Sequence, residues 1–490
     1  MVRAARERAF RRGLSMAWRS VIGSIVAVLM TIMDIQITNA AIGPIQAALH
    51  APLADASWIS SAYLIAEIVT LPLTGLLSRR LGYRRYAQVF SVMFMAASVL
   101  CAQSTSFEML VGCRLLQGVA GGALMPLAYS LIMTRLPDGE HGRAMSLFGA
   151  MVTLAPMLGP VMGGFLTAHF GWASIFYLNL PIGLVGLALM MSGLRDEPAA
   201  GRERTRVDWP GLVLIVIGLG SLQYVLEEGN RYGWFASRDI AVLTGVALVA
   251  LAAFVVRERA SAHPLVALGL LANRQLRIAC AANVTTGAAV FGTYFLVPYF
   301  LIELQRYTPA QISLVILYGG AVQLSILGFI PRILKRVHVH VLVVVGALLS
   351  CISAWMWSLA AADFSYASVV VAQLLRGLGF TLMLTPLGVL ATTATVKHDA
   401  PSASILFNIS RSLGGAIGVA LLTALVGIRH AAYLDGSGGA HGAADDRAGF
   451  VLAFGQTFAV MAGFLAAMAL AFAALHVRQA ARARQAARGA

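Results

Sequence analysis

The chain has 490 residues, of which 59% are hydrophobic and only 12% charged, and its formal net charge is +15 at pH 7. Soluble globular proteins carry roughly 25% charged residues, so this composition excludes an ordinary soluble enzyme or binding domain. The apolar segments are mostly about 20 residues long, which is the length of a helix crossing a bilayer core of ~30 Å. The composition therefore indicates an integral membrane protein built from helices.

Hydropathy predicts fourteen transmembrane helices. They are expected, in chain order, at about 20–42, 57–78, 86–104, 108–133, 144–168, 173–193, 209–227, 240–256, 277–301, 311–331, 340–360, 365–392, 402–427 and 451–475.

The basic residues predict the orientation of these helices. If the segments between spans alternate between two sides, most Lys and Arg fall on the side of the N-terminus. The exceptions outside the spans are Arg231, Arg238, Arg306, Arg429 and Arg447. Cytoplasmic loops carry an excess of Lys and Arg, so we expect both termini to be cytoplasmic. The high net charge therefore sets topology and predicts no nucleic-acid partner.

Two stretches from the first half of the chain recur in the second half. LLQGVAGGALMPLA from Leu115 resembles LLRGLGFTLMLTPLG from Leu374, and PMLGPVMGG from Pro156 resembles RSLGGAIGV from Arg411. The matches relate spans four and five to spans twelve and thirteen, so both copies have the same orientation. This is the pattern of two parallel six-helix halves with a substrate site between them. Small-residue helix packing is the simpler alternative.

The repeat predicts an all-α membrane protein of two six-helix halves with two inserted helices. The expected organisation is a cytoplasmic segment 1–19, a first half 20–193, a cytoplasmic linker 194–208, inserted helices 209–256, a second half 257–476 and a basic cytoplasmic tail 477–490.

Few ionisable residues lie well inside the predicted spans, namely the acids Asp34 and Glu67 and the arginines Arg114, Arg376 and Arg411. A carboxylate away from water favours its neutral form, and a nearby arginine favours the ionised form. A group whose proton affinity changes with conformation can couple a proton gradient to transport. Asp34 is the first candidate for this role. The alternative is a fixed ion pair with Arg114 that positions helices. Glu67 is a second proton site, a site for cationic substrates, or a structural residue.

The four cysteines all fall in predicted spans and form no CxxC pair, so neither a disulfide framework nor a metal site is expected. A Gly-Lys-Ser/Thr phosphate-binding motif is also missing, which argues against direct ATP drive. We find no convergent nucleophiles or paired acids, so no catalytic residues and no cofactor are predicted.

Several motifs occur in a characteristic order along the chain. They are Asp34 to Ile42, TGLLSRRLGYRR (74–85), Arg114 with Gln117 and Gly118, Gly159-Pro160 with Gly163-Gly164, WASIFYLNLPIG (172–183) and NISRSLGGAIG (408–418). Together they resemble the major facilitator superfamily, specifically its fourteen-helix drug:proton antiporter branch of EmrB/QacA type. The resemblance covers most of the chain.

The resemblance implies a proton-coupled exporter of amphipathic drugs or toxic compounds in the bacterial inner membrane. A narrow exporter of one metabolite, antibiotic or lipid remains the alternative. Relatives of EmrB type work with a periplasmic adaptor and an outer-membrane channel, which are therefore candidate partners.

The motifs and the repeat also assign residues to roles. Proton coupling is predicted for Asp34, Glu67 and Arg114. The substrate cavity is predicted to involve Asn39, Gln117, Met125, Phe148, Asn408 and Arg411. The conformational motifs comprise Gly75, Gly82, Arg84, Gly159, Pro160, Gly163 and Gly164. The basic loop containing Arg84 is expected to face anionic lipid or a neighbouring helix end.

Overall fold

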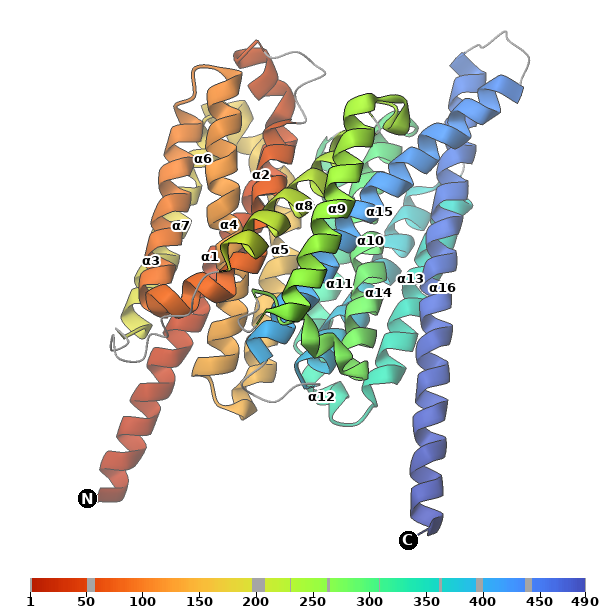
Figure 1. Cartoon of the computed structure of the whole chain (residues 1–490). Coiled ribbons are helices and arrows are strands. Elements are labelled where there is room, and N and C mark those ends of the chain that lie inside the picture. The colour runs from red at the N-terminus through yellow and green to blue at the C-terminus, as the bar shows by residue number, and fades with distance from the viewer. Residues whose placement is uncertain are drawn as a thin grey trace. The chain divides into compact units, whose positions relative to one another are not determined.

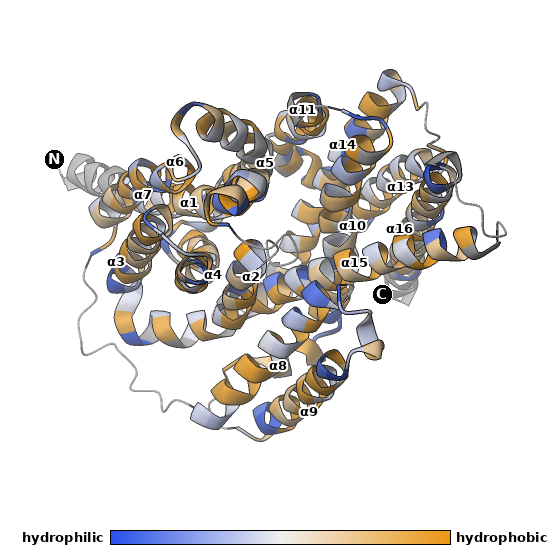
Figure 2. Cartoon of the chain, turned by 90° about the horizontal axis from the view of Figure 1, so that it is seen from above, coloured by the Kyte–Doolittle hydropathy of each residue, from blue (hydrophilic) through white to orange (hydrophobic). Residues whose placement is uncertain are grey.

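The computed structural model describes residues 2–50, 58–195, 208–229, 231–261, 265–307, 309–360, 364–393, 400–436 and 443–489. In these residues the regular secondary structure is helical, without a strand (Figure 1). The predicted linker 194–208 lies mostly outside the described residues. Hydrophobic residues are distributed along the helices of the described chain (Figure 2).

The chain packs into two compact units. The first comprises Met1–Ala272 and Thr395–Ile409, and the second comprises Asn273–Ala394 and Ser410–Ala490.

The helices of the first unit are α1 (Val2–Ala48), α2 (Trp58–Thr70), η2 (Leu71–Leu73), α3 (Thr74–Ala102), α4 (Phe107–Arg135), α5 (Asp138–Phe170), α6 (Ser174–Tyr177), α7 (Asn179–Gly193), α8 (Trp209–Glu228), η4 (Trp234–Ala236), α9 (Arg238–Ala260) and η5 (Leu268–Ala272). Those that follow are α10 (Arg274–Glu303), α11 (Pro309–Leu327), α12 (Ile330–Leu334), α13 (Val339–Ser358), α14 (Tyr366–Thr393), α15 (Ala400–Gly436) and α16 (Ala443–Gly489). The boundary between the units falls within α15.

Eleven helices of the described chain are long and apolar enough to cross a membrane, so the protein is a multi-pass membrane protein. Three shorter apolar helical segments accompany them, at Trp58–Thr70, Val161–Phe170 and Leu314–Leu327. The expected span 57–78 is interrupted, because α2 ends at Thr70 and a short 3₁₀ turn follows. Pro72 in that turn has no backbone N–H, so it cannot continue the hydrogen bonding of an α-helix.

The first and last helices extend beyond the predicted spans. Helix α1 begins at Val2 and therefore includes nearly all of the cytoplasmic segment that was expected to stand apart at residues 1–19. Helix α16 continues to Gly489 and includes most of the predicted tail 477–490. Both segments are rich in Ala and Arg, which favour the helix even where charge ends the hydrophobic span.

Glycines hold the helix pairs of each unit in close contact, and they do so at the positions that the sequence repeat aligns. A Cβ atom on Gly118 of α4 would lie 2.3 Å from the Tyr63 carbonyl oxygen of α2. A Cβ atom on its repeat partner Gly377 of α14 would lie 2.1 Å from the Gly319 carbonyl oxygen of α11. Only glycine permits backbones to approach this closely.

The second pair of repeat motifs behaves in the same way. A Cβ atom on Gly159 of α5 would lie 2.4 Å from the Gln36 Cβ of α1, and one on Gly414 of α15 would lie 2.2 Å from the Val284 carbonyl oxygen of α10. The repeated glycines thus bring together helix pairs α1–α5 and α2–α4 in the first unit, and α10–α15 and α11–α14 in the second.

The basic motif 74–85 turns sharply at Gly82, whose φ of 72° and ψ of 153° interrupt the helical conformation of α3. This backbone conformation is almost restricted to glycine, which explains why Gly82 is the residue at the turn. Arg84 Nη1 donates a hydrogen bond of 3.0 Å to the Leu194 carbonyl oxygen at the end of α7. Arg84 therefore meets a neighbouring helix end, one of the two expected surroundings of this loop.

Helices α8 and α9 form an adjacent pair, and α8 also packs on α2 (Figure 1). Asp208 caps the N-terminus of α8 by accepting a hydrogen bond of 3.1 Å from the Gly211 N–H. The same carboxylate pairs with Arg257 near the end of α9, where Nη2 lies 2.7 Å from Oδ1. One side chain therefore fastens the start of α8 to the end of α9.

Candidate functional site

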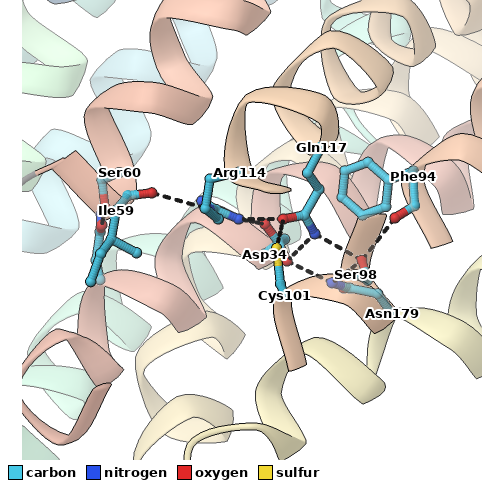
Figure 3. Close-up of polar contacts among 10 residues, drawn as sticks. Asp34, Ile59, Ser60, Phe94, Ser98, Cys101, Arg114, Gln117 and Asn179 are labelled. Atoms are coloured by element: carbon cyan, nitrogen blue, oxygen red, sulfur yellow. Dashed lines mark hydrogen bonds and ion pairs between the residues drawn. The ribbon is translucent and has the colours of Figure 1, made fainter. Parts of the chain in front are cut away.

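The acid of the first transmembrane helix is buried in the first unit. Asp34 is only 2% exposed, and its Oδ2 pairs with Nη1 of Arg114, which is fully buried. The two residues lie on α1 and α4, 80 positions apart in sequence. A buried ion pair stabilises a fold only when further hydrogen bonds satisfy both partners. The surroundings of Asp34 supply several such bonds (Figure 3).

Two amides hold the other oxygen of the Asp34 carboxylate. Gln117 Nε2 of α4 donates to Oδ1 at 2.9 Å, and Asn179 Nδ2, at the start of α7, donates to the same oxygen at 2.5 Å. Both amides also donate to the Ser98 hydroxyl oxygen of α3, at 2.8 and 3.2 Å respectively. Ser98 in turn donates to the Phe94 carbonyl oxygen at 2.9 Å. The side chains of Gln117, Asn179 and Ser98 are all fully buried.

The guanidinium of Arg114 has further contacts. Its Nη1 donates to Gln117 Oε1 at 2.7 Å, and its Nε donates to the Ile59 carbonyl oxygen of α2 at 2.9 Å. Its Cζ lies 4.6 Å from the centre of the Tyr63 ring, within range of a cation–π interaction. Nη2 is buried and has no hydrogen-bond partner among the described residues. Arg114 thus connects Asp34 to both α2 and α4.

This cluster joins five elements, α1, α2, α3, α4 and α7, around one carboxylate. Protonation of Asp34 would remove its negative charge and leave Arg114 as a buried cation without a counterion. Removal of one partner from a buried pair costs about 3–5 kcal/mol, which is enough to change the relative stability of two helix arrangements. The cluster can therefore convert a change in protonation into a change in packing.

The other predicted proton site, Glu67, lies on a different helix from Asp34. It lies on α2 one turn beyond Tyr63 and is partly buried. Its backbone meets α4 closely, since a Cβ atom on Gly122 would lie 2.5 Å from the Glu67 carbonyl oxygen.

Asn39 lies apart from the Asp34 cluster. It is exposed, and its Oδ1 accepts a hydrogen bond of 2.5 Å from the Ser60 hydroxyl of α2. Five residues of helix rotate a side chain by about 140°, so Asn39 and Asp34 point in different directions from α1.

The remaining predicted cavity residues are distributed over three helices. Gln117 belongs to the Asp34 cluster. Met125 of α4 and Phe148 of α5 are 6% and 5% exposed and lie in the apolar core of the first unit. Asn408 of α15 is buried and donates from Nδ2 to the Ser404 carbonyl oxygen at 2.9 Å. Arg411 lies on the same helix and is partly buried.

The predicted conformational motif of α5 packs on α1 beside Asp34. Gly159 is in tight contact with Gln36, and a Cβ atom on Gly163 would lie 2.9 Å from the Ile37 carbonyl oxygen. A Cβ atom on Gly164 would meet nothing within 4 Å. Pro160 falls within α5. Gly75 is less confined than Gly159, because its added Cβ would meet only Ile405 Cδ1, at 3.4 Å.

Ser98 and Asn179 are site residues that sequence reasoning missed. Asn179 falls in the characteristic stretch 172–183 but was assigned no role, and Ser98 belongs to no motif. A usable signal was present for Asn179, because a polar amide within an apolar span usually has a buried partner.

Comparisons with known proteins place the chain among transporters. The Major Facilitator Superfamily model matches residues 24–419. The chain is 30% identical to the multidrug export protein EmrB of Escherichia coli (strain K12) over 401 residues, which cover 82% of this chain and 78% of that protein. It is 31% identical to the fatty acid resistance protein FarB of Neisseria gonorrhoeae over 419 residues, covering 84% and 81% respectively.

Among solved structures, the crystal structure of the human organic anion transporter MFSD10 (TETRAN) resembles this one. The TM-score is 0.62 at 13% sequence identity, and the match covers 93% of this chain and 99% of that chain. At this identity the likeness concerns the fold alone.

Proposed function

The chain belongs to the Major Facilitator Superfamily, and we propose that it exports drugs or other toxic amphipathic compounds in exchange for protons. It is a membrane transporter of the EmrB/QacA-type branch, because relatives named as multidrug export proteins match most of its length. Proton coupling follows from the family, and the proton gradient is the proposed energy source without a cofactor.

The observation that carries the proposal is the buried Asp34 cluster. Asp34 is the proton-accepting group, and Arg114 is its counterion in the deprotonated state. Gln117 and Asn179 keep the carboxylate oriented towards Arg114. Glu67 is proposed as a second ionisable group on α2, for protons or cationic substrates.

The proposed topology has fourteen transmembrane helices in two six-helix halves, with α8 and α9 inserted. Support comes from the eleven long apolar helices, the three shorter apolar segments and the repeated glycine contacts. Both termini are proposed to face the cytoplasm of a bacterium, because the basic residues concentrate on that side of the predicted spans.

Asn39, Asn408 and Arg411 are proposed to contact substrate, with Met125 and Phe148 as adaptable apolar residues. The glycines of α5 and the turn at Gly82 would allow the helices to rearrange during alternating access.

A periplasmic adaptor and an outer-membrane channel are proposed partners. This proposal rests on the likeness to EmrB-type proteins, and co-purification of a membrane-anchored adaptor with the transporter would test it.

A narrow exporter is the second candidate function. The similarity to a protein named for fatty acid resistance favours it, because that name refers to a single class of lipid-like compound.

An efflux screen in a pump-deficient bacterial strain tests the proposal. Cells that express the transporter should retain less of several chemically different amphipathic dyes, and a protonophore should abolish the difference. Export of one compound alone would favour the narrow exporter. Unchanged dye retention across the whole panel would contradict the proposed function.

A further inference from the structure

The second unit contains a buried arginine that the Asp34 cluster does not use. Arg376 of α14 is 2% exposed, and its Nε donates a hydrogen bond to Gln373 Oε1 on the preceding turn. Its Nη1 is buried without a hydrogen-bond partner among the described residues. Burial of an arginine within a membrane is costly, so such a residue normally pairs with an acid or serves a function.

The sequence repeat relates this residue to the Asp34 cluster. Aligning Leu115-Leu116 with Leu374-Leu375 places Arg114 opposite Gln373 and Gln117 opposite Arg376. Each unit therefore holds an Arg–Gln pair three residues apart on equivalent helices, with the order reversed. Each pair is joined by a hydrogen bond from the guanidinium to the amide oxygen.

The two pairs differ in the anion available to them. In the first unit Asp34 of α1 supplies a carboxylate to Arg114. In the second unit the glycine contacts make α10 the counterpart of α1, and the sequence of α10 contains no Asp or Glu before Glu303 at its end. Helices α11, α13 and α14 contain no acidic residue at all. No acidic residue is therefore available on these four helices, except at the end of α10, to neutralise Arg376.

The surroundings of Arg376 combine a cation with aromatic surface. Its Cζ lies 4.8 Å from the centre of the Tyr294 ring and 5.8 Å from that of Phe380. Gly319 of α11 lies against the guanidinium, because a Cβ atom there would be 2.9 Å from Nη2. Gln373 engages Nε and Gly319 packs against Nη2, so the buried Nη1, which has no partner among the described residues, is the donor left for an acid group. A carboxylate oxygen can accept a charge-assisted hydrogen bond from such a donor.

We propose that Arg376 binds the acid group of an amphipathic organic anion, a monocarboxylate with an aromatic or aliphatic body. The substrate carboxylate pairs with Arg376 as Asp34 pairs with Arg114. The apolar body of the substrate lies against Tyr294 and Phe380. Access to the site comes with the helix movements of the transport cycle. This inference rests on the proposed export function and adds a substrate class to it.

The test compares 2-naphthoate with its neutral analogue 2-naphthamide, which has nearly the same shape. Binding of each to the purified full-length protein in nanodiscs of zwitterionic lipid is measured by equilibrium dialysis. Wild-type protein should bind the carboxylate about tenfold more tightly than the amide, as expected for a charge-assisted hydrogen bond. Arg376→Gln should remove this preference, and Arg376→Lys should retain part of it.

The matched control is Arg332→Gln, which removes one exposed arginine of the same unit and should leave the preference unchanged. Thermal unfolding and gel filtration establish that each variant is folded. An undiminished preference for naphthoate in folded Arg376→Gln, or equal binding of the two compounds to wild type, would overturn the inference.

Transport of a cationic dye separates this inference from the proposed function. Proton-driven efflux of the cationic dye by wild-type protein in proteoliposomes tests the exporter by itself. Failure of wild-type efflux would count against the exporter, whereas the naphthoate measurement decides the role of Arg376 independently.

Discussion

At the scale of single residues, the cluster around Asp34 shows why an acid is tolerated in the first transmembrane helix. One carboxylate oxygen meets Arg114, and the other accepts hydrogen bonds from Gln117 and Asn179. Every partner is itself buried, so in the folded protein water does not compete for these hydrogen bonds. The position of Asn179 on α7 makes it the most distant contributor in sequence, 145 residues from Asp34.

Replacement of Asn179 should weaken the cluster without eliminating its ion pair. Asn179→Ala removes donors to Asp34 and Ser98, so we expect a loss of about 1–3 kcal/mol of stability and reduced efflux. Thermal unfolding and dye efflux check this. The control is Ser192→Ala on the same helix, since Ser192 is exposed and bonds only to the Leu189 carbonyl oxygen of its own helix. Equal stability of both variants would show that Asn179 contributes nothing measurable.

The sequence predicted some members of this site and missed others for physical reasons. The pairing of Asp34 with Arg114 followed from the cost of two opposite charges in apolar spans. Ser98 and Asn179 carry no charge, so burial gives them no comparable signal in a single sequence. Asn39 was assigned to the substrate cavity because of its motif, and the rotation of the helix points it in a different direction from Asp34.

At the scale of helices, the packing of α5 on α1 depends on one glycine close to Asp34. In Gly159→Ala the new methyl group would lie 2.4 Å from Gln36 Cβ, so the helices must separate. We expect a loss of about 1–3 kcal/mol of stability, together with impaired efflux. Gly164→Ala on the same helix is the matched control, because its methyl group meets open space. Similar unfolding temperatures for the two variants would argue against tight α1–α5 packing.

The stabilisation that the α8–α9 contact provides should depend on pH through the ionisation of Asp208. The hydrogen bond from Arg257 holds the pKa of Asp208 below its ordinary value. A lowered pKa in the folded state stabilises the fold above the unfolded pKa of about 3.9, and this stabilisation is lost as pH falls below that value.

Asp208→Asn keeps a residue suited to the N-cap but removes the charge. The variant should unfold about 1–2 °C below wild type at pH 7, because a partly exposed pair contributes little. The difference should shrink as the pH falls below about 4. A difference that is constant between pH 7 and pH 3 would exclude an electrostatic origin.

The helical elements themselves were largely predictable from hydropathy, whereas their ends were not. Charge ended the predicted first and last spans, yet α1 and α16 continue through Ala- and Arg-rich segments that favour helix. Gly82 was assigned to a conformational motif, and the chain turns there. The interruption after Thr70 was not predicted, because proline also occurs inside several of these helices without ending them.

At the scale of the whole molecule, the two units share equivalent helix contacts but differ in the acid available to their buried arginine. In the first unit an Arg–Gln pair holds an acid of the chain. In the second unit the acid on helices α10, α11, α13 and α14 is Glu303, at the end of α10. This difference suggests a division of labour. In the proposed mechanism, protons act on the first unit through Asp34, and the acid group of a substrate acts on the second through Arg376.

The most direct test of proton coupling uses Asp34→Asn in proteoliposomes loaded with a dye that wild-type protein transports. A pH gradient should drive dye accumulation by wild type but not by the variant. Exchange of labelled for unlabelled dye, which needs no gradient, should persist in the variant and shows that it is folded and binds substrate. Gradient-driven accumulation by Asp34→Asn at the wild-type rate would contradict the assignment of Asp34 as the proton-coupling residue.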